Sequence, residues 1–356
     1  MHLGFGIYRH QLDRAHLDFA RQCGATHIVV HMVDYFRSAR ANPANDQPVG
    51  DDCGWGLAGD PDHLWTVEEL TAIRKQIESH GLVLAAIENF DPAHWHDVLL
   101  DGPKKQAQLK NLGTIIRNVG AAGIPMFGYN FSIAGVAGRV KKACGRGNAE
   151  VVAMEGAYDT PIPQGMVWNM VYDEHAKPGT LPPITHDQLW SRLADFLAAL
   201  IPVAEEAGVT LAAHPDDPPM PTVRGQPRLV HQPRLYQRLI DLQPSPRNQL
   251  EFCLGTLAEM SEGDIYQTVD TYSRQQRVGY IHFRNVRGKV PTYQETFIDE
   301  GDIDMLKVLR ILKDNGYRGV LIPDHAPGMT CAAPWHAGMA FACGYMRAAM
   351  QTIGVT

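Results

Sequence analysis

Four apolar, strand-like runs in the second half of the chain each end near a side chain that can bind a metal ion. The runs are LAAHPDDPP, LEFCLGT, YIHFRNV and LIPDH, and the side chains are His214, Cys253, His282 and Asp324. One such residue alone is usually packed or hydrogen-bonded, but four on successive strand ends indicate a shared site. Only a fold whose strand ends converge can bring them together. A (β/α)8 barrel does this at the carboxyl ends of its strands, so the pattern predicts a barrel with one divalent-metal site there.

The alternation of strand-like and helical segments is typical of an α/β protein. Stretches 65–82, 104–124 and 186–209 carry apolar residues at helical spacing, and glycine recurs where helices give way to strands. The count of eight strand candidates, together with the convergent ligands, predicts a closed TIM barrel as one domain over residues 1–356. The candidate strands are 2–8, 25–32, 83–89, 125–131, 209–214, 249–254, 278–284 and 319–324.

Three segments rich in Gly, Pro, Asn and Asp resemble insertions in the barrel. They are residues 34–62, 132–185 and 215–248, and they follow the second, fourth and fifth predicted strands. Connections after strands lie at the carboxyl face of a barrel, so these segments are expected over the catalytic face. A lid, an oligomer contact and plain loops all remain open.

Charge and composition restrict the class of partner. The net charge is −7 and the pI is about 6.1, which argues against binding to nucleic acid or to an anionic membrane. We expect no membrane span, because no uninterrupted apolar run approaches 18 residues, and a cytoplasmic location. A small-molecule substrate is expected instead. The six cysteines lack CxxC spacing and are expected as free thiols in a reducing compartment; they lie at positions 23, 53, 144, 253, 331 and 343.

Several strings resemble those of the mannonate dehydratase family, a group of (β/α)8 barrels related to xylose isomerase. The matching strings are HPDDPP at 214–219, the strand-end Cys253, H-x-RNV at 282–286 and PDH at 323–325. The resemblance implies that His214, Cys253, His282 and Asp324 hold a divalent ion, usually Mn²⁺. It also implies that His325 takes part in proton transfer, and that the protein forms a homo-oligomer, as family members often do.

The donor set suits several metals. Two imidazoles, a thiolate and a carboxylate can bind Mn²⁺, Fe²⁺, Co²⁺ or Zn²⁺. The thiolate favours iron or zinc, whereas the resemblance and a hydroxy-acid substrate favour manganese. Abstraction of the proton beside a carboxylate places negative charge on two oxygens, and a divalent ion with two open positions can stabilise that charge.

Other polar residues are candidates for proton transfer or substrate binding. His325 is the expected acid/base, although it could instead orient Asp324. Arg284 and Arg139 could grip a carboxylate, or each could form a structural ion pair. Glu88 and Asn130 could bind substrate hydroxyls, and either Asp216 or Asp217 could support a ligand. The family's catalytic tyrosine in the loop after PDH has no clear equivalent, and His336 stands near its place.

The function predicted from these residues is dehydration of a sugar acid, most simply D-mannonate to 2-keto-3-deoxy-D-gluconate and water. The alternative is a metal-dependent sugar isomerase or epimerase of the xylose isomerase-like group, because the residues expected to contact the substrate differ from the family pattern. A noncatalytic sugar-binding barrel is a third reading, disfavoured by the joint presence of all four ligands and His325. No GxGxxG string follows a strand, which disfavours hydride transfer.

Overall fold

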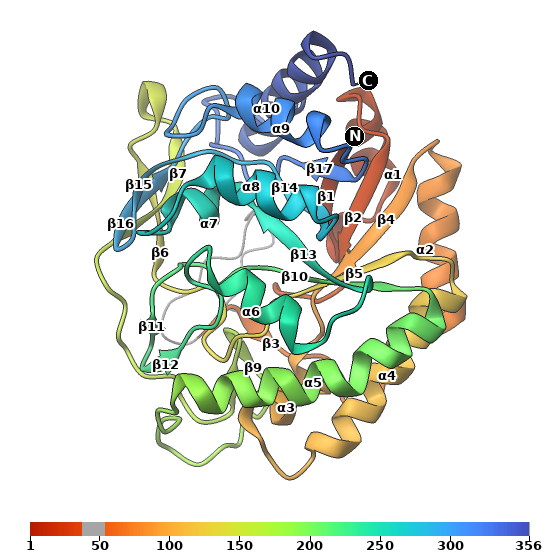
Figure 1. Ribbon diagram of the computed structural model, residues 1–356, viewed down its shortest axis with the longest axis vertical. Helices are drawn as coiled ribbons and strands as arrows, with labels where there is room; N and C mark the ends of the chain where they lie inside the picture. Colours follow the sequence, from red (N-terminus) through yellow and green to blue (C-terminus); the bar gives the residue numbers. More distant parts are fainter. Residues whose placement is uncertain (38–53, 356) are drawn as a thin grey trace.

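A computed structural model describes residues 1–37 and 54–355. Its centre is a closed barrel of eight parallel strands, in the spatial order β1-β17-β14-β13-β10-β5-β4-β2 (Figure 1). Each predicted strand range overlaps one barrel strand, so the predicted TIM barrel is confirmed. The barrel strands are β1 (His2–Tyr8), β2 (His27–His31), β4 (Val83–Glu88), β5 (Met126–Tyr129), β10 (Thr210–Ala213), β13 (Asn248–Cys253), β14 (Val278–His282) and β17 (Val320–Ile322).

Helices surround the barrel, and their starts follow from local sequence. Helix α2 begins after Thr66, whose hydroxyl accepts from the Glu69 amide while the Glu69 carboxylate accepts from the Thr66 amide. Helix α5 ends at Gly208, whose φ of 71° is the left-handed conformation that glycine adopts without strain. The longer helices are α1 (Arg14–Gln22), α2 (Val67–Ser79), α4 (Lys105–Ala121), α5 (His186–Ala207), α6 (Leu235–Leu242), α8 (Ile265–Arg274), α9 (Met305–Asp314) and α10 (Pro334–Thr352). The short ones are α3 (His96–Leu100), α7 (Leu254–Glu259), η1 (Arg9–Gln11), η2 (Pro92–His94) and η3 (Arg146–Asn148).

Small sheets stand beside the barrel, where the sequence suggested irregular insertions. Four antiparallel strands in the order β15-β16-β7-β6 form one sheet, seen at the left of Figure 1. The segment 132–185 therefore contains ordered strands. The hairpin that completes this sheet, after β14, was not predicted. The strands are β6 (Arg139–Ala143), β7 (Glu150–Glu155), β15 (Val286–Lys289), β16 (Thr292–Glu295), β3 (Gly56–Leu57), β8 (Met166–Val167), β9 (Met170–Val171), β11 (Thr222–Val223) and β12 (Gln226–Pro227).

The other two predicted insertions differ in what the structure describes. The interpretation of 215–248 as an insertion is wrong at its carboxyl end, because α6 (235–242) packs against β13 in the barrel wall. The remainder of that segment carries the hairpin of β11 and β12. Much of the predicted insertion 34–62 lies outside the described residues. Its residues 56–57 form β3, which pairs with β9.

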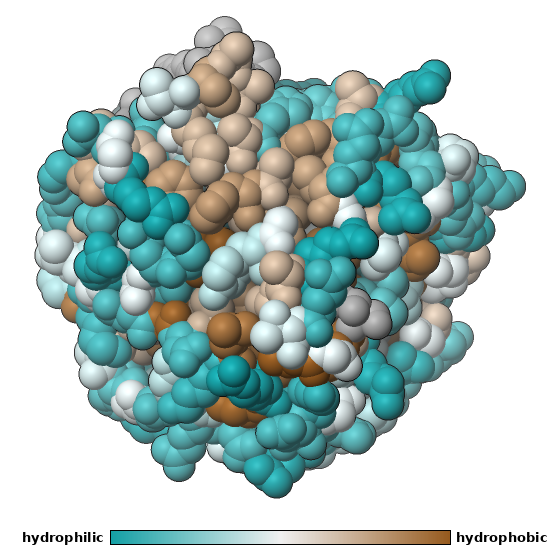
Figure 2. Space-filling model, turned by 90° about the horizontal axis from the view of Figure 1, so that it is seen from above, coloured by the Kyte–Doolittle hydropathy of each residue, from teal (hydrophilic) through white to brown (hydrophobic). Residues whose placement is uncertain are grey.

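The molecular surface is mainly hydrophilic on the face shown in Figure 2, where hydrophobic side chains gather toward the middle. Among the described residues, the large hydrophobic side chains that stand out as exposed are Val83 and Val140. No helix in the described part of the chain has the length and apolar character needed to cross a membrane.

Candidate metal centre

The candidate site lies directly above an apolar layer inside the barrel. The layer is a separate buried cluster that includes Val29, Ala86, Ala212, Tyr280 and Ile322. Side chains along a strand alternate between its two faces, so the residue two positions further on faces the same way. In the same order, those next residues are His31, Glu88, His214, His282 and Asp324. The polar site thus continues the inward faces of five strands beyond their apolar part.

The structure brings the four predicted ligands together. Nitrogen atoms of His214 and His282 and the sulfur of Cys253 all lie within 4.8 Å of one another. The Asp324 carboxylate adjoins them, with Oδ2 3.4 Å from Nδ1 of His282. Asp324 has a φ of 59°, a left-handed conformation that is uncommon outside glycine and occurs often at functional sites.

The donor set fits a divalent transition metal. It offers two imidazole nitrogens, one thiolate sulfur and one carboxylate oxygen, a mixture suited to first-row ions. Nδ1 of His282 is buried and makes no hydrogen bond among the described residues, as expected of an atom placed for a ligand outside the chain. These residues could therefore hold the predicted ion.

Nearby positive charges keep the two acidic ligands, Cys253 and Asp324, in the deprotonated form that binds a metal. Burial raises the pKa of the Cys253 thiol, but Arg284 and the neighbouring His214 and His282 outweigh it and lower the pKa to about 5. Burial raises the pKa of Asp324, but His282 and His325 lower it well below the ordinary range. A thiolate and a carboxylate are thus available at neutral pH.

Metal-free protein should show this thiolate directly. We expect the ultraviolet absorbance of the Cys253 thiolate to appear with a midpoint near pH 5, far below the ordinary thiol value. The measurement is a difference titration between the metal-free wild type and Cys253→Ser, which removes this thiolate alone. A difference signal that develops only above about pH 8 would show that the surrounding cations do not stabilise the thiolate.

Two carboxylates contact Nε2, the second ring nitrogen of His282; Glu88 was predicted as a site residue and Glu251 was not. Nε2 lies 2.9 Å from Oε1 of Glu251 and 3.3 Å from Oε2 of Glu88. Glu88 also accepts a hydrogen bond from the Tyr280 hydroxyl at 3.2 Å. A carboxylate on the far nitrogen fixes the tautomer and orientation of a metal-binding histidine. Glu251 was missed, although it lies two residues before Cys253 on the same inward face of β13.

A glycine makes room for this arrangement. A Cβ atom on Gly128 of β5 would collide with the Tyr280 hydroxyl and approach Oε2 of Glu251. Glu88, Glu251 and His282 also place one ligand atom each within 4.8 Å of one another. The base of the site is therefore rich in carboxylate oxygens as well as in histidine.

The two candidate arginines have different surroundings. Arg284 is buried and donates to Asp324 at 3.1 Å, Glu259 at 2.9 Å and Asp217 at 3.0 Å, which engages all three of its nitrogens. This geometry favours the structural ion-pair alternative over a grip on substrate. Arg139 lines the cavity above the metal ligands; its buried Nη1 lies 3.9 Å from Asp217 and 3.7 Å from Glu295 but makes no hydrogen bond among the described residues. Arg139 thus remains a candidate for a carboxylate ligand.

The two aspartates of the HPDDPP string, Asp216 and Asp217, also have different surroundings. Asp216 accepts from the amides of Leu229 and Val230 and pairs with Arg228 at 3.1 Å, so it organises the loop. Asp217 lines the cavity and forms an ion pair with Arg284, which in turn contacts the candidate ligand Asp324.

Asn130 and His336 occupy different places. Asn130 lines the cavity, but its amide already donates to the Pro215 carbonyl and accepts from the Trp168 indole. His336 was expected near the position of the family tyrosine, and the structure does not place it in the cavity. It lies on α10, 4.7 Å from the Phe19 ring and 5.8 Å from the His16 ring. Helix α10 begins two residues before His336, and its direction turns the His336 side chain toward α1.

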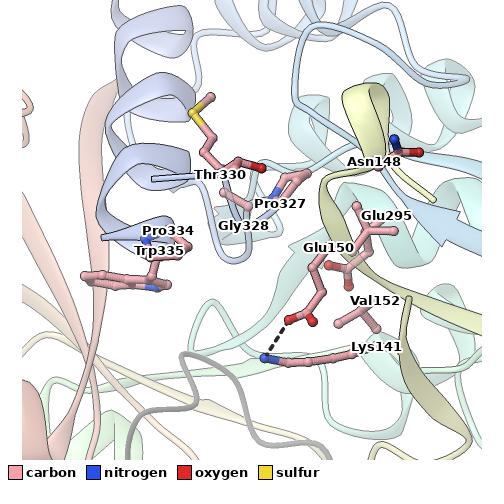
Figure 3. A pocket seen from close by; sticks show the side chains of 13 residues that line it. Lys141, Asn148, Glu150, Val152, Glu295, Pro327, Gly328, Thr330, Pro334 and Trp335 are labelled. Atoms are coloured by element: carbon pink, nitrogen blue, oxygen red, sulfur yellow. Dashed lines mark ion pairs between the residues drawn. The ribbon is translucent and has the colours of Figure 1, made fainter. Parts of the chain in front are cut away.

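His325 lines the inner cavity and contacts Glu295, which lines a larger outer one. Its Nδ1 lies 3.0 Å from Oε1 of Glu295, and its Nε2 lies 3.3 Å from Oδ1 of Asp324. Glu295 also lines an outer cavity of about 460 Å³ between the β6–β7 sheet and the loop that leads into α10 (Figure 3). Lys141 and Glu150 form a 3.4 Å ion pair on its wall. Glu295 was not identified from the sequence, because it reaches the site from the unpredicted hairpin.

A closed (β/α)8 barrel with a ligand cluster at the carboxyl ends of its strands defines an enzyme of the TIM-barrel class. The sequence matches the D-mannonate dehydratase (UxuA) family over residues 1–142 and 179–355. The chain belongs to this family, and the prediction of a hydro-lyase of the mannonate dehydratase kind is confirmed.

Individual relatives agree with this assignment. Mannonate dehydratase of Streptococcus suis (strain 05ZYH33) is 31% identical over 277 residues, which span 73% of this chain and 74% of the relative. Mannonate dehydratase 2 of Halalkalibacterium halodurans is 29% identical over 275 residues, 74% of this chain and 79% of the relative. The crystal structure of mannonate dehydratase from Streptococcus suis serotype 2 superposes with a TM-score of 0.75 and 27% identity, covering 100% of this chain and 95% of that one.

More distant structures share the fold alone. D-psicose 3-epimerase from Clostridium cellulolyticum H10 has a TM-score of 0.55 and 12% identity, covering 99% of this chain and 98% of that one. At such identity the likeness concerns the barrel and carries no statement about chemistry.

Proposed function

We propose that this protein is a divalent-metal-dependent dehydratase of a sugar acid, most simply D-mannonate, which it converts to 2-keto-3-deoxy-D-gluconate and water. The observation that carries the proposal is the convergence of His214, Cys253 and His282 within 4.8 Å, with Asp324 and His325 alongside. Membership of the family and the names of its relatives support the choice of substrate.

His214, Cys253, His282 and Asp324 would hold the ion, for which we propose manganese. The bound ion would supply positive charge to the substrate's carboxylate and hydroxyl oxygens. Arg139, whose Nη1 lies at the cavity wall without a hydrogen bond among the described residues, would bind the carboxylate of the acid.

His325 would move the proton. An imidazole can deliver a proton to a departing hydroxyl group or remove one from the acidic carbon. Glu295 accepts from Nδ1 and so holds the ring with Nε2 toward Asp324 and the inner cavity. Water in the outer cavity would reach Glu295, because that side chain lines the outer cavity, while His325 lines the inner one.

A sugar epimerase remains the second candidate, and the observation that favours it is the pair of carboxylates, Glu88 and Glu251, at the base of the site. Such groups can shuttle a proton on a carbon without loss of water. The two functions differ in their product.

Substitution of His325 tests the proposal. We expect manganese-loaded wild type to form a 2-keto-3-deoxy acid from D-mannonate or a related aldonic acid, and His325→Asn to be about 10²- to 10⁴-fold slower. Product formation is followed on a panel of aldonic acids, with the metal content of each protein measured alongside. His336→Asn, which changes a histidine outside the cavity, is the control and should remain active. Epimerised acids without loss of water would favour the second candidate.

A further inference from the structure

His31 is placed in the site by strand register. It is the last residue of β2, and it pairs in register with Tyr8 of β1 on one side and with Glu88 of β4 on the other. The four candidate metal ligands come instead from β10, β13, β14 and β17 or the residues just after them. His31 therefore lines the inner cavity from the strands that supply no ligand to the ion.

One nitrogen of His31 has no protein partner that satisfies it. Nδ1 is buried and makes no hydrogen bond among the described residues. The carboxylate oxygen Oε1 of Glu88 lies 3.7 Å away, which is too far for a hydrogen bond. Buried polar atoms in folded proteins are nearly always hydrogen-bonded, so an unsatisfied one at a cavity wall indicates a partner outside the chain.

Aromatic contacts hold the His31 ring in this orientation. It stacks on Tyr8 with 4.8 Å between centroids, and Tyr35 approaches it edge-on at 6.1 Å. Tyr35, Trp55 and Trp168 line the same cavity and contact one another. Apolar ring faces suit the C–H groups of a carbohydrate chain, which leaves its hydroxyl groups to the few polar atoms on this wall.

We propose that His31 is a specificity-determining residue that hydrogen-bonds one hydroxyl group of the sugar acid, on the cavity wall away from the ion. The inference rests on the proposed function and extends it to substrate recognition. A hydroxyl placed beside Nδ1 can also reach Glu88, since a hydroxyl both donates and accepts. An acid lacking that hydroxyl, or carrying it in the opposite configuration, leaves the buried nitrogen unpaired and is bound less well.

The test compares wild type with His31→Phe, which keeps an aromatic ring on Tyr8 and removes both nitrogens. The substrates are the best-turned-over aldonic acid and its monodeoxy analogues. In wild type, removal of one particular hydroxyl should lower kcat/KM about 10- to 100-fold. In His31→Phe the parent acid should lose a similar factor, while that deoxy acid changes less than about 3-fold. Manganese content should be unchanged.

His10→Phe is the matched control. His10 is exposed, lies 6.0 Å from the Tyr8 ring and does not line the cavity, so the parent acid should keep its kcat/KM. Equal losses on every acid in His31→Phe, or no loss, would overturn the proposal. If wild type turns over no aldonic acid, calorimetric binding of the same acids to manganese-loaded protein decides. Weaker binding to His31→Phe than to wild type then supports the assignment while the proposed reaction fails. Absence of binding to wild type rejects both.

Discussion

His282→Ala is expected to abolish tight manganese binding and to lower dehydration of the sugar acid by more than about 100-fold. Partners that only orient a metal ligand already contribute about 10- to 100-fold to affinity or activity, so loss of the ligand itself should cost more. His282 also faces Asp324 with one nitrogen and Glu251 and Glu88 with the other. Among the described residues, the other candidate histidine ligand, His214, instead has its Nδ1 against the Pro215 carbonyl.

The same substitution should destabilise the metal-free protein. Burial lowers the pKa of His282, but Asp324, Glu88 and Glu251 outweigh it and raise the pKa well above its ordinary value, so the ring is cationic. Removing one partner of a buried ion pair typically costs about 3–5 kcal/mol, because the remaining charge is left uncompensated. The measurements are manganese titration, turnover and urea unfolding. His96→Ala, at a buried histidine that stacks on Tyr172 away from the site, should keep its manganese affinity. Undiminished manganese affinity in His282→Ala would exclude it as a ligand.

Arg284→Met is expected to lower the free energy of unfolding by about 3–5 kcal/mol at neutral pH. The guanidinium is buried and joins the carboxylates of Asp217 and Asp324; it also donates to Glu259, whose pKa burial raises well above its ordinary value. Methionine fills much of the volume but leaves these acids without their shared cation. Urea unfolding of metal-free protein measures the loss. Arg146→Met, which breaks an exposed pair with Asp299, is the control and should cost no more than about 1 kcal/mol.

The cost of Arg284→Met should depend on pH in a defined direction. Burial raises the pKa of Asp217, but Arg139 and Arg284 outweigh it and lower the pKa below its ordinary value. The pKa of Asp324 lies even further below its ordinary value, mainly because of His282 and His325. The pKa values of these two carboxylates are lower in the folded protein than in the unfolded chain, where they are near 4. The stability that they contribute is fully present above the unfolded pKa and is lost as the pH falls through the folded pKa values. The difference between variant and wild type should therefore shrink below about pH 4. A difference of under 1 kcal/mol at pH 7 would contradict the role of Arg284 as the shared cation.

The sequence predicted the barrel and its ligand cluster because both depend on local periodicity. Apolar strands separated by amphipathic helices define the closed sheet, and the residue at each strand end is placed by alternation. Glu251 followed the same rule two positions before Cys253, yet it lies within an apolar string and was overlooked. Glu295 could not be inferred in this way, because an antiparallel hairpin pairs with a distant insertion strand to bring it beside His325.

Loop residues were the least predictable part of the site. His336 was expected in the cavity from its place after the PDH string, but the direction of α10 turns it toward α1. His31 ends a strand and faces inward, so its position was predictable once the register was known. Its unsatisfied nitrogen became visible only with the neighbouring side chains in place.

Turnover of D-mannonate by metal-stripped protein, before and after addition of manganese, tests the account most directly. Appearance of 2-keto-3-deoxy-D-gluconate is followed while bound manganese is measured on the same sample. We predict no product from the stripped protein, and activity that rises with occupancy until one ion is bound per chain. Full manganese occupancy without a keto-deoxy product from D-mannonate or any other aldonic acid would contradict the proposed function.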